Sequence, residues 1–271
     1  MDFIRCYASL ANPVVVVWNE FSRDNGRILS GVCGLTVCAI PTNIGLAAAL
    51  NIGIEKAFDS GAERVLLLDQ DSRPTPEMLG RLSSVFDAAV LQGVNVALAG
   101  PTLRDRKAHG VVNRVKDRNK AFEIVPRLST SGSLIDREAF EKVRGMWADL
   151  FIDCIDHEWC YRAQSMGFSI VQAVDVDMNH DMGDSGINFL GHYKPIHRSP
   201  VRHYYITRNV IWMARQAYVP KMFTVMELLK LLYRIPVYFI VSSSKSKTAV
   251  GIVNGIRDGL FALPAKRRLD V

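Results

Sequence analysis

Residues 64–74 read Arg-Val-Leu-Leu-Leu-Asp-Gln-Asp-Ser-Arg-Pro, an apolar run that breaks into two acids on alternate positions. Such a run bounded by turn residues predicts a strand that leaves a sheet near Asp69. Because residues i and i+2 of an extended chain point to the same side, Asp69 and Asp71 can converge on one cation or polar ligand. Ligands of open α/β sheets bind at the carboxyl ends of strands. The alternative is two solvated acids starting a turn before Pro74.

The composition is that of a globular protein. The chain has 271 residues, 49% of them hydrophobic, which suffices for one large domain or one domain with an appendage. Five cysteines, an odd number without an even framework, indicate reduced thiols in a cytosolic setting. The first ten residues include Asp2 and Arg5 and have too short an apolar run for a secretion signal.

The charge balance favours anionic partners. The net charge is +6 and the pI about 9.1, with a basic cluster at Lys266, Arg267 and Arg268. A sugar diphosphate or an anionic lipid surface would suit this charge. Nucleic acid is not expected, because the chain has neither zinc-finger spacing nor an RNP-type aromatic signature. A solvated surface without a special partner is the alternative.

Strand-like and helix-like stretches alternate along the chain in the manner of an α/β fold. The expected strands cover residues 14–17, 35–40, 65–69, 94–100, 130–135 and 169–174. The expected helices cover residues 44–58, a stretch beginning near 76, and residues 154–166.

The composition shifts from Met222 onward toward an amphipathic stretch rich in Leu and Tyr. We therefore expect one domain over residues 1–221 and an amphipathic basic tail over residues 222–271. The most apolar part, residues 228–241, contains charged residues and a proline and falls short of the roughly 20 apolar residues of a spanning helix. An interfacial helix on an anionic membrane is expected instead, which would make the protein cytoplasmic and peripheral on the inner face of the cell membrane.

Several sequence blocks occur in a characteristic order. They are Asn43-x-Gly45, Asn51-x-Gly53, Leu-Leu-Leu-Asp-Gln-Asp-Ser, Ser131-Gly132-Ser133, Asp153-x-x-Asp156-x-Glu158-Trp159 with Arg162, and His180-x-x-Gly183. In this order they resemble family 2 glycosyltransferases. The resemblance covers about residues 14–215. A single Asp-x-Asp motif has little specificity, whereas the ordered set is specific.

Within that family, two features are most similar to bacterial rhamnosyltransferases that build surface polysaccharides. They are the Asp-Gln-Asp-Ser form and residues 199–209, which read Ser-Pro-Val-Arg-His-Tyr-Tyr-Ile-Thr-Arg-Asn. The resemblance implies a GT-A-like fold, in which helices flank a mixed sheet. It also implies an inverting transferase that moves L-rhamnose from dTDP-L-rhamnose onto a cell-surface polysaccharide or lipid-linked glycan.

A divalent cation is the cofactor that the resemblance implies. Asp71 would coordinate Mg²⁺ or Mn²⁺, His180 would complete the metal site, and Asp69 would hold the nucleotide ribose or the metal's water shell. A hard cation bound through oxygens eases the departure of a diphosphate.

The second acidic cluster supplies the candidate base. Inverting transfer needs a general base that removes the proton of the acceptor hydroxyl. Counting back six positions from Arg162 places Asp156 at the family's base position. On a helix beginning near residue 154, Asp156 would lie in the first turns, where backbone dipoles favour the ionised form. Asp153 and Glu158 are then expected to cap the helix or to contact the acceptor, and a structural role is the alternative for each.

Other residues are expected to bind the donor. Asn43 and Asn51 belong to the family's nucleotide-sugar blocks by resemblance. Arg202 and Arg208 are expected to close over the donor diphosphate, because a guanidinium matches phosphate geometry bidentately. Ordinary helix packing is the alternative for the segment that carries the two arginines.

The N-terminal region departs from the family's pattern. The family's sheet begins with a strand ending in a Tyr-Asn-type turn, then a helix and a second strand ending in Asp-Asn. Val14 to Val17 leads into Trp18-Asn19 and reaches Asn43 after only 26 residues, which fits the second strand. We therefore expect the first strand to be missing, Trp18 to replace the usual Asp, and nucleotide binding to be weakened.

Three other interpretations compete. A catalytically silent homologue acting as a scaffold in glycan assembly would share the sequence blocks and the altered N-terminal region. A haloacid-dehalogenase-type phosphatase also has Asp-x-Asp after an apolar strand, but its first motif usually begins the chain. Cys154-x-x-His157-x-x-Cys160 offers three soft ligands, whereas a structural zinc site needs four.

Overall fold

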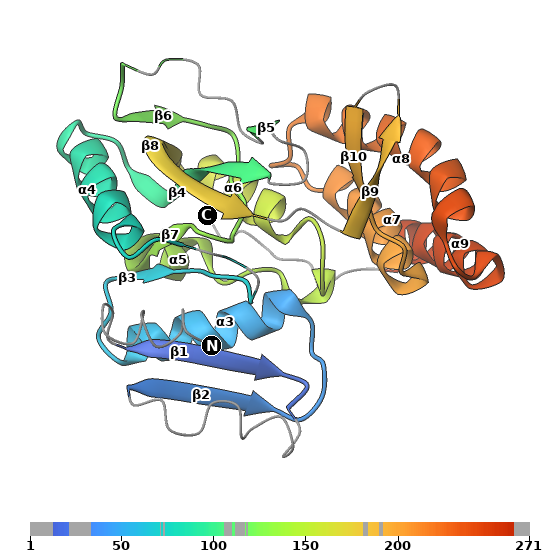
Figure 1. The fold of residues 1–271 in the computed structure, drawn as a ribbon, viewed down its shortest axis with the longest axis horizontal. Coiled ribbons are helices and arrows are strands. Elements are labelled where there is room, and N and C mark those ends of the chain that lie inside the picture. Colours follow the sequence, from blue (N-terminus) through green and yellow to red (C-terminus); the bar gives the residue numbers. More distant parts are fainter. Residues whose placement is uncertain are drawn as a thin grey trace.

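The computed structural model describes residues 13–21, 34–70, 72, 74–105, 110–111, 117, 119–180, 184–189 and 192–262. Strands and helices are interspersed along the chain up to β8, and three helices follow the last strand (Figure 1). In chain order the elements are β1 (Val14–Asn19), β2 (Leu35–Ile40), α3 (Leu46–Asp59), β3 (Arg64–Leu66), α4 (Met78–Leu91), β4 (Val96–Asp105), β5 (Gly110–Val111), β6 (Phe122–Ile124), β7 (Leu134–Asp136), α5 (Arg137–Val143), the 3₁₀ helix η2 (Ala148–Leu150), α6 (Ile155–Ser165), β8 (Ser169–His180), β9 (Asp184–Phe189), β10 (His192–Ile196), α7 (Pro200–Ala214), α8 (Lys221–Val241) and α9 (Lys245–Phe261).

The main sheet has six strands and is mixed, which confirms the expected fold class. Its order is β3-β7-β4-β8-β6, with β5 paired to β4. β4 and β8 run parallel, whereas β7 lies antiparallel between β3 and β4. Within the described ranges, β3 therefore reaches the rest of the sheet through β7 alone, whose register places Leu66 beside Leu134.

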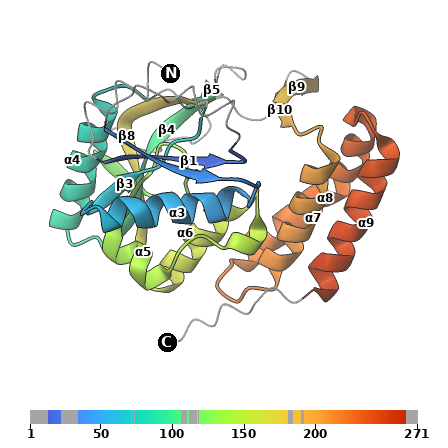
Figure 2. The ribbon, with the colours of Figure 1, turned by 90° about the horizontal axis from the view of Figure 1, so that it is seen from below.

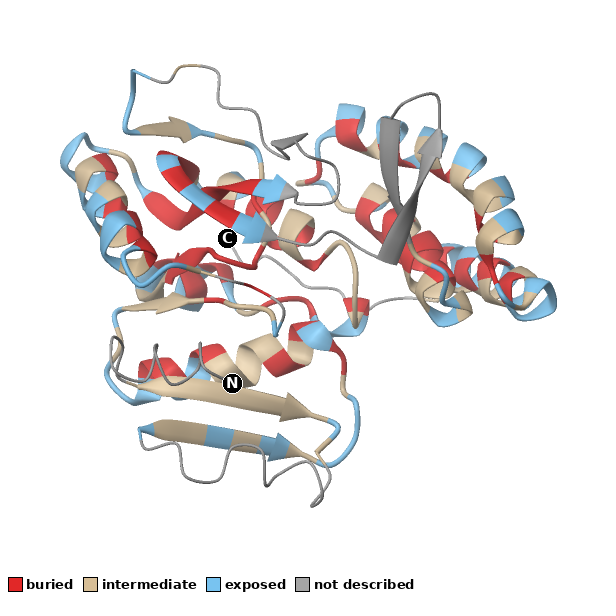
Figure 3. Cartoon of the chain, in the orientation of Figure 1, coloured by how far each residue is buried: buried red, intermediate tan, exposed pale blue. Residues whose placement is uncertain are grey.

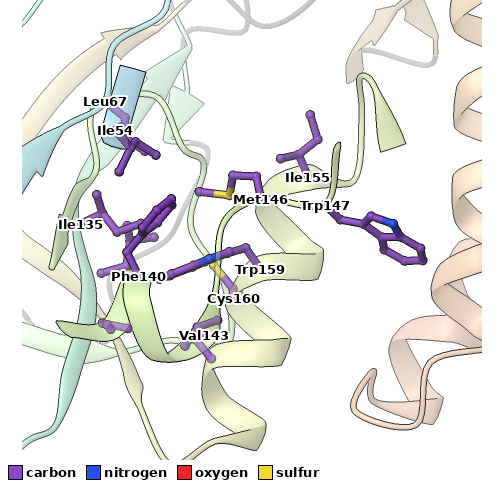
Figure 4. Close-up of a cluster of buried hydrophobic side chains, with 14 of the residues drawn as sticks. Ile54, Leu67, Ile135, Phe140, Val143, Met146, Trp147, Ile155, Trp159 and Cys160 are labelled. Carbon is purple, nitrogen blue, oxygen red and sulfur yellow. The ribbon is translucent and has the colours of Figure 1, made fainter. Parts of the chain in front are cut away.

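Two cores form because successive side chains of a strand point to opposite faces of the sheet. In β7, Ile135 joins the core under α3, α5 and α6, whereas its neighbour Leu134 joins the core under α4. In β8, Ile170 and Val171 divide in the same way. Figure 4 shows Trp159 of α6 reaching into the first core, and Figure 3 shows how buried these strands are.

β1 and β2 form a separate parallel pair, with Val14 beside Leu35 and Asn19 beside Ile40. All six residues of β1 are only half-buried, and α3 covers the strand closely enough that a Cβ on Gly53 would lie 2.9 Å from the Val17 side chain. Among the described residues β1 pairs only with β2 and β3 pairs only with β7, so no backbone ladder joins the two sheets. This arrangement is compatible with the expected missing strand, a prediction that falls partly on residues 1–12, outside the described residues.

Each predicted strand overlaps an observed one, but the bounds differ: β3 ends at Leu66 and β7 begins only at Leu134, whereas β1, β4 and β8 extend beyond the prediction, and β5, β6, β9 and β10 were not predicted. β4 and β8 continue past residues 100 and 174 and stay paired as far as Asp105 and His180. In the added part of β8, Val176 and Met178 are buried while Asp175 and Asp177 are exposed. The alternation of acids with apolar residues was a strand signal with period two that the prediction did not use.

The segment expected to be a tail contains two helices that pack with α7 (Figure 2). α9 approaches α7 through glycines, since a Cβ on Gly255 would lie 2.7 Å from the Tyr204 carbonyl oxygen. The boundary at residues 221 and 222 stays a prediction. No helix in the described ranges is long and apolar enough to cross a membrane.

Candidate active site

α6 places the candidate base at its N-terminal end. Asp156 is the second residue of the helix, is half-buried, and accepts a hydrogen bond through Oδ1 from the His157 backbone N–H at 2.8 Å. The unpaired backbone N–H groups of a first helical turn favour a negative charge there. An ionised carboxylate at this position can accept a proton.

Glu158, two positions further on, has a different environment. Its carboxylate forms a fully buried ion pair with Arg162, with Nε–Oε1 at 2.7 Å and Nη2–Oε2 at 2.9 Å. The Tyr218 hydroxyl donates to Oε1 at 2.6 Å, and Arg162 also donates to the carbonyl oxygens of Val143, Arg144 and Gly145. Glu158 is 0% exposed and the helix has no side-chain cap, so the structural alternative is the correct one for this residue. It anchors α6 to the chain after α5.

The loop before α6 has an unusual backbone. Phe151, Asp153 and Cys154 all have positive φ values, of 64°, 66° and 64°. The Ile152 N–H donates to the Leu150 carbonyl at 2.7 Å, which makes Phe151 the centre of a classic γ-turn. Left-handed conformations of non-glycine residues cost about 1 to 3 kcal/mol each and persist only where the surroundings impose them.

The Cys154 side chain is half-buried, and its thiol favours the protonated form. Desolvation, with the nearby charges of Asp153 and Asp156, raises the pKa of the Cys154 thiol well above its ordinary value. Burial likewise raises the pKa of Cys160 to about 12. Neither thiol favours the thiolate form that binds metals. In the described part of the chain, no three His, Cys, Asp or Glu side chains gather as metal ligands.

Two serines hold the turn that follows β3. The Asp69 backbone N–H donates to Ser72 Oγ at 3.2 Å and to Ser131 Oγ at 3.5 Å, and the two hydroxyls form a short hydrogen bond with each other. Ser72 and Ser131 are buried, at 0% and 1% exposure. The Ser-Gly-Ser block therefore supports the Asp69 turn, a role that its place in the sequence order did not indicate.

The expected metal ligands lie partly outside the described residues. Asp71 is one of the residues that are not described, and so are 181–183. His180 ends β8, where its backbone pairs with Asp105 at the end of β4, and its side chain is not described. A carboxylate and an imidazole are ligands that suit Mn²⁺.

Both asparagines of the Asn-x-Gly blocks make backbone contacts. Asn43 Oδ1 accepts from the Gly45 N–H at 3.0 Å and from Asn19 Nδ2 at 3.2 Å, which shapes the turn into α3. Asn51 exchanges two hydrogen bonds with the backbone of Met146, at 2.6 and 2.9 Å. Asn43 lies at the end of the β1–β2 sheet, whereas Asn51 lies inside α3 and faces the chain after α5.

The two arginines of α7 point toward the loop before α6. Arg202 forms a bidentate ion pair with Asp153, with Nη2–Oδ1 at 2.8 Å and Nε–Oδ2 at 3.0 Å. Asp153 therefore pairs with α7 and does not cap α6 with its side chain, because no side-chain cap is present there. Arg208 is 7% exposed and donates to the carbonyl oxygens of Asp149 and Leu150. A diphosphate contact by Arg208 would have to break these bonds.

The structure thus brings several of the expected residues to one loop. The Phe151 carbonyl accepts from the Leu46 N–H at 2.6 Å, so the loop before Asp156 also meets the start of α3, next to Asn43. Arg202 reaches the same loop from α7. Asp69 is held separately, by the serine pair.

Similarity to solved structures defines the class of protein. The chain shares its fold with TarS residues 1–349 of S. aureus in complex with UDP-GlcNAc, with a TM-score of 0.53, 16% identity, and coverage of 96% of this chain and 76% of that chain. A structure of GalNAc-T7 with UDP, GalNAc and Mn²⁺ gives a TM-score of 0.52 at 15% identity over 77% of this chain, and this chain spans only 43% of that one. The fold is that of GT-A glycosyltransferases.

Sequence similarity identifies the family within this class of protein. The family model "Glycosyl transferase family 2" matches residues 5–144. The dTDP-rhamnosyl transferase RfbF of Shigella flexneri is 32% identical over 247 residues, which cover 86% of this chain and 80% of that protein. The chain belongs to glycosyl transferase family 2 and is a glycosyltransferase, which sets the phosphatase interpretation aside.

Proposed function

We propose that this glycosyltransferase moves L-rhamnose from dTDP-L-rhamnose, with inversion at the anomeric carbon, onto a cell-surface polysaccharide or lipid-linked glycan. The observation that carries the donor assignment is the 32% identity, over most of both chains, with a dTDP-rhamnosyl transferase. The acceptor class and the inverting course rest on the sequence resemblance and on the position of Asp156.

Asp156 is the general base of the proposed reaction. Its carboxylate takes the proton of the acceptor hydroxyl while that oxygen forms a bond to the anomeric carbon. The bond from this carbon to the diphosphate breaks on the opposite side, and dTDP leaves. The buried Glu158–Arg162 pair supports this choice of carboxylate, because Glu158 is enclosed and already paired.

Asp71 and His180 are the proposed ligands of Mg²⁺ or Mn²⁺. Asp69 and Asn43 are proposed to bind the nucleotide sugar. When bound, such a cation would neutralise charge on the departing diphosphate. Asp71→Ala should abolish the metal dependence of dTDP binding, and Asp69→Asn should weaken it less. Calorimetry of dTDP with Mn²⁺ measures both, and unchanged affinity in Asp71→Ala would exclude the metal assignment.

A donor screen tests the function itself. Purified protein with Mn²⁺ or Mg²⁺ is incubated with each of several nucleotide sugars, and release of the free nucleotide is measured. The proposal expects dTDP-L-rhamnose to be consumed fastest. Faster consumption of another nucleotide sugar would overturn the donor assignment.

The silent scaffold is the second candidate, and one observation favours it. In the described residues β1 and β3 each lack a second strand partner, at the edge where the family's first strand belongs. This interpretation predicts neither dTDP binding nor consumption of any donor. Micromolar dTDP binding would exclude it.

Membrane association is also proposed, with the protein peripheral on the cytoplasmic face of an anionic membrane. α8 exposes Leu232 and Ile240, at 69% and 77% of their surface, and α9 exposes Phe261 at 78%. Lysines of the same two helices supply positive charge. Flotation with vesicles containing anionic lipid tests this, because Leu232→Ser with Ile240→Ser should reduce binding, whereas Leu91→Ser on α4, 87% exposed in the wild type, should not.

A further inference from the structure

One face of α7 packs against the strained loop that precedes the candidate base. Arg202, Tyr205 and Asn209 follow one another at helical spacing of three and four residues, so they share a side of the helix. Each contacts part of the loop of residues 151–154, which leads directly into α6. The loop is far from α7 in sequence, so these contacts depend on the tertiary fold.

Asn209 makes the densest of these contacts. Its Nδ2 lies within hydrogen-bond distance of three carbonyl oxygens, those of Leu150 at 2.9 Å, Ile152 at 2.8 Å and Asp153 at 3.0 Å. The side chain is fully buried. A single amide group that faces three carbonyls of one loop restricts the backbone path of that loop.

The other two residues hold the ends of the loop. The Tyr205 ring stacks on the Phe151 ring, with centroids 4.6 Å apart and planes at 8°. Arg202 pairs bidentately with the Asp153 carboxylate, whose exposure is 16%. A bidentate pair fixes orientation as well as distance.

The opposite side of the loop rests on α3. The Phe151 carbonyl accepts from the Leu46 N–H at 2.6 Å, and Gly45, with φ of 86°, leaves room for the Phe151 ring. A Cβ on Gly45 would lie 2.5 Å from that ring. The positive φ values of the loop are therefore imposed from two sides, as a strained conformation requires.

We propose that Arg202 and Asn209 are positioning residues, which fix loop 151–154 and through it the direction of the Asp156 carboxylate toward the acceptor. This inference rests on the proposed role of Asp156. It replaces a donor contact for Arg202, because the Nε/Nη2 edge of its guanidinium is already engaged by Asp153.

The test separates positioning from donor binding. Arg202→Gln, Arg202→Lys and Asn209→Asp are compared for kcat and KM in Mn²⁺-dependent release of dTDP from dTDP-L-rhamnose, for dTDP affinity by calorimetry, and for Tm. Arg215→Gln is the matched control, because Arg215 at the end of the same helix donates to the Gly259 and Leu260 carbonyls of α9.

Positioning predicts that Arg202→Gln lowers kcat by about ten- to a hundredfold, since small displacements of a reacting group have effects of that size. KM and dTDP affinity should change by less than about twofold, in contrast to the loss expected for a phosphate ligand. Arg202→Lys should recover part of the kcat, and Arg215→Gln should match the wild type. Asn209→Asp should lose kcat at least as strongly with dTDP affinity kept.

Two results would overturn the inference. One is a wild-type kcat in Arg202→Gln and Asn209→Asp. The other is weakened dTDP binding with kcat intact, which would return Arg202 to the donor site. Asp156→Asn, measured in parallel, distinguishes a failure of the base assignment from a failure of the positioning role. If that variant is fully active, the base assignment of the proposed function fails. If it is inactive while the α7 variants are normal, only the positioning role fails.

Discussion

The region around α6 is packed and hydrogen-bonded more closely than the region around β1. At α6, a buried ion pair, a buried asparagine and a bidentate arginine hold the chain from several sides. At β1, six half-buried residues rely on one parallel neighbour and on the cover of α3. Two-stranded pairs have marginal stability by themselves.

The two regions meet different requirements of the proposed reaction, one for the general base and one for the nucleotide. A general base must be held within a fraction of an ångström of its working position, so its surroundings are closely packed. The edge at β1 and β3 lies where we propose that the nucleotide binds, and its two strands are not joined by a ladder in the described residues. The closer packing therefore lies around α6, on the side of the proposed acceptor chemistry.

The largest expected effect is chemical and falls on the α6 region. Asp156→Asn should lower kcat by about 10²- to 10⁴-fold, because that is the range typical of a lost general base. Tm and dTDP affinity should stay near wild type, since the residue is half-buried and makes only a local backbone contact. Full activity of this variant would show that the closely packed α6 region does not carry the general base.

The next effect concerns dynamics. Backbone amides of β1 should exchange with solvent faster than those of β8 by a factor on the order of a hundred or more, because weakly packed elements open locally before the whole protein unfolds. Hydrogen exchange read by mass spectrometry measures this on the unmodified chain. Equal protection of the two strands would break the comparison, as it would show a single cooperative unit.

Core truncations should sharpen the same contrast. Ile135→Ala in β7 removes a fully buried side chain and should lower the free energy of unfolding by about 2 to 5 kcal/mol. Val15→Ala in β1 should cost about 1 kcal/mol or less, because its side chain is only half-buried. Urea denaturation compares the two variants. Equal losses would mean that β1 contributes as much as the main sheet.

The smallest effect is a pH dependence in the helices beside α6. Burial lowers the pKa of His203 below its ordinary 6.5, although the hydrogen bond to the His197 carbonyl opposes the shift. The unfolded chain therefore binds the proton first as the pH falls, and stability is lost from about pH 6.5 downward toward the folded pKa. The slope is at most about 1.4 kcal/mol per pH unit. His203→Gln should flatten it, and identical slopes between pH 7 and 5 would count against this origin.

Local patterns in the sequence were enough to predict the fold class and the order of the larger elements up to β8, but not β5, β6 or α5. Apolar runs of strand length and apolar residues at helical spacing depend only on neighbours in the chain. The same holds for the position of Asp69 just after a strand and of Asp156 in a first helical turn. These parts of the fold and of the candidate site follow from short-range geometry.

The tertiary structure decided which polar groups remain available for chemistry. Arg208 and Glu158 carry charges that suit a ligand or an acceptor, yet partners far along the chain occupy them, at Asp149 and Leu150 for the arginine and at Tyr218 for the glutamate. No spacing rule predicts three positive φ values in non-glycine residues, because their cost is met only by contacts from α3 and α7. Long-range packing therefore separates the residues that hold the loop from the proposed general base, whereas the sequence alone shows them as equally plausible acids and bases.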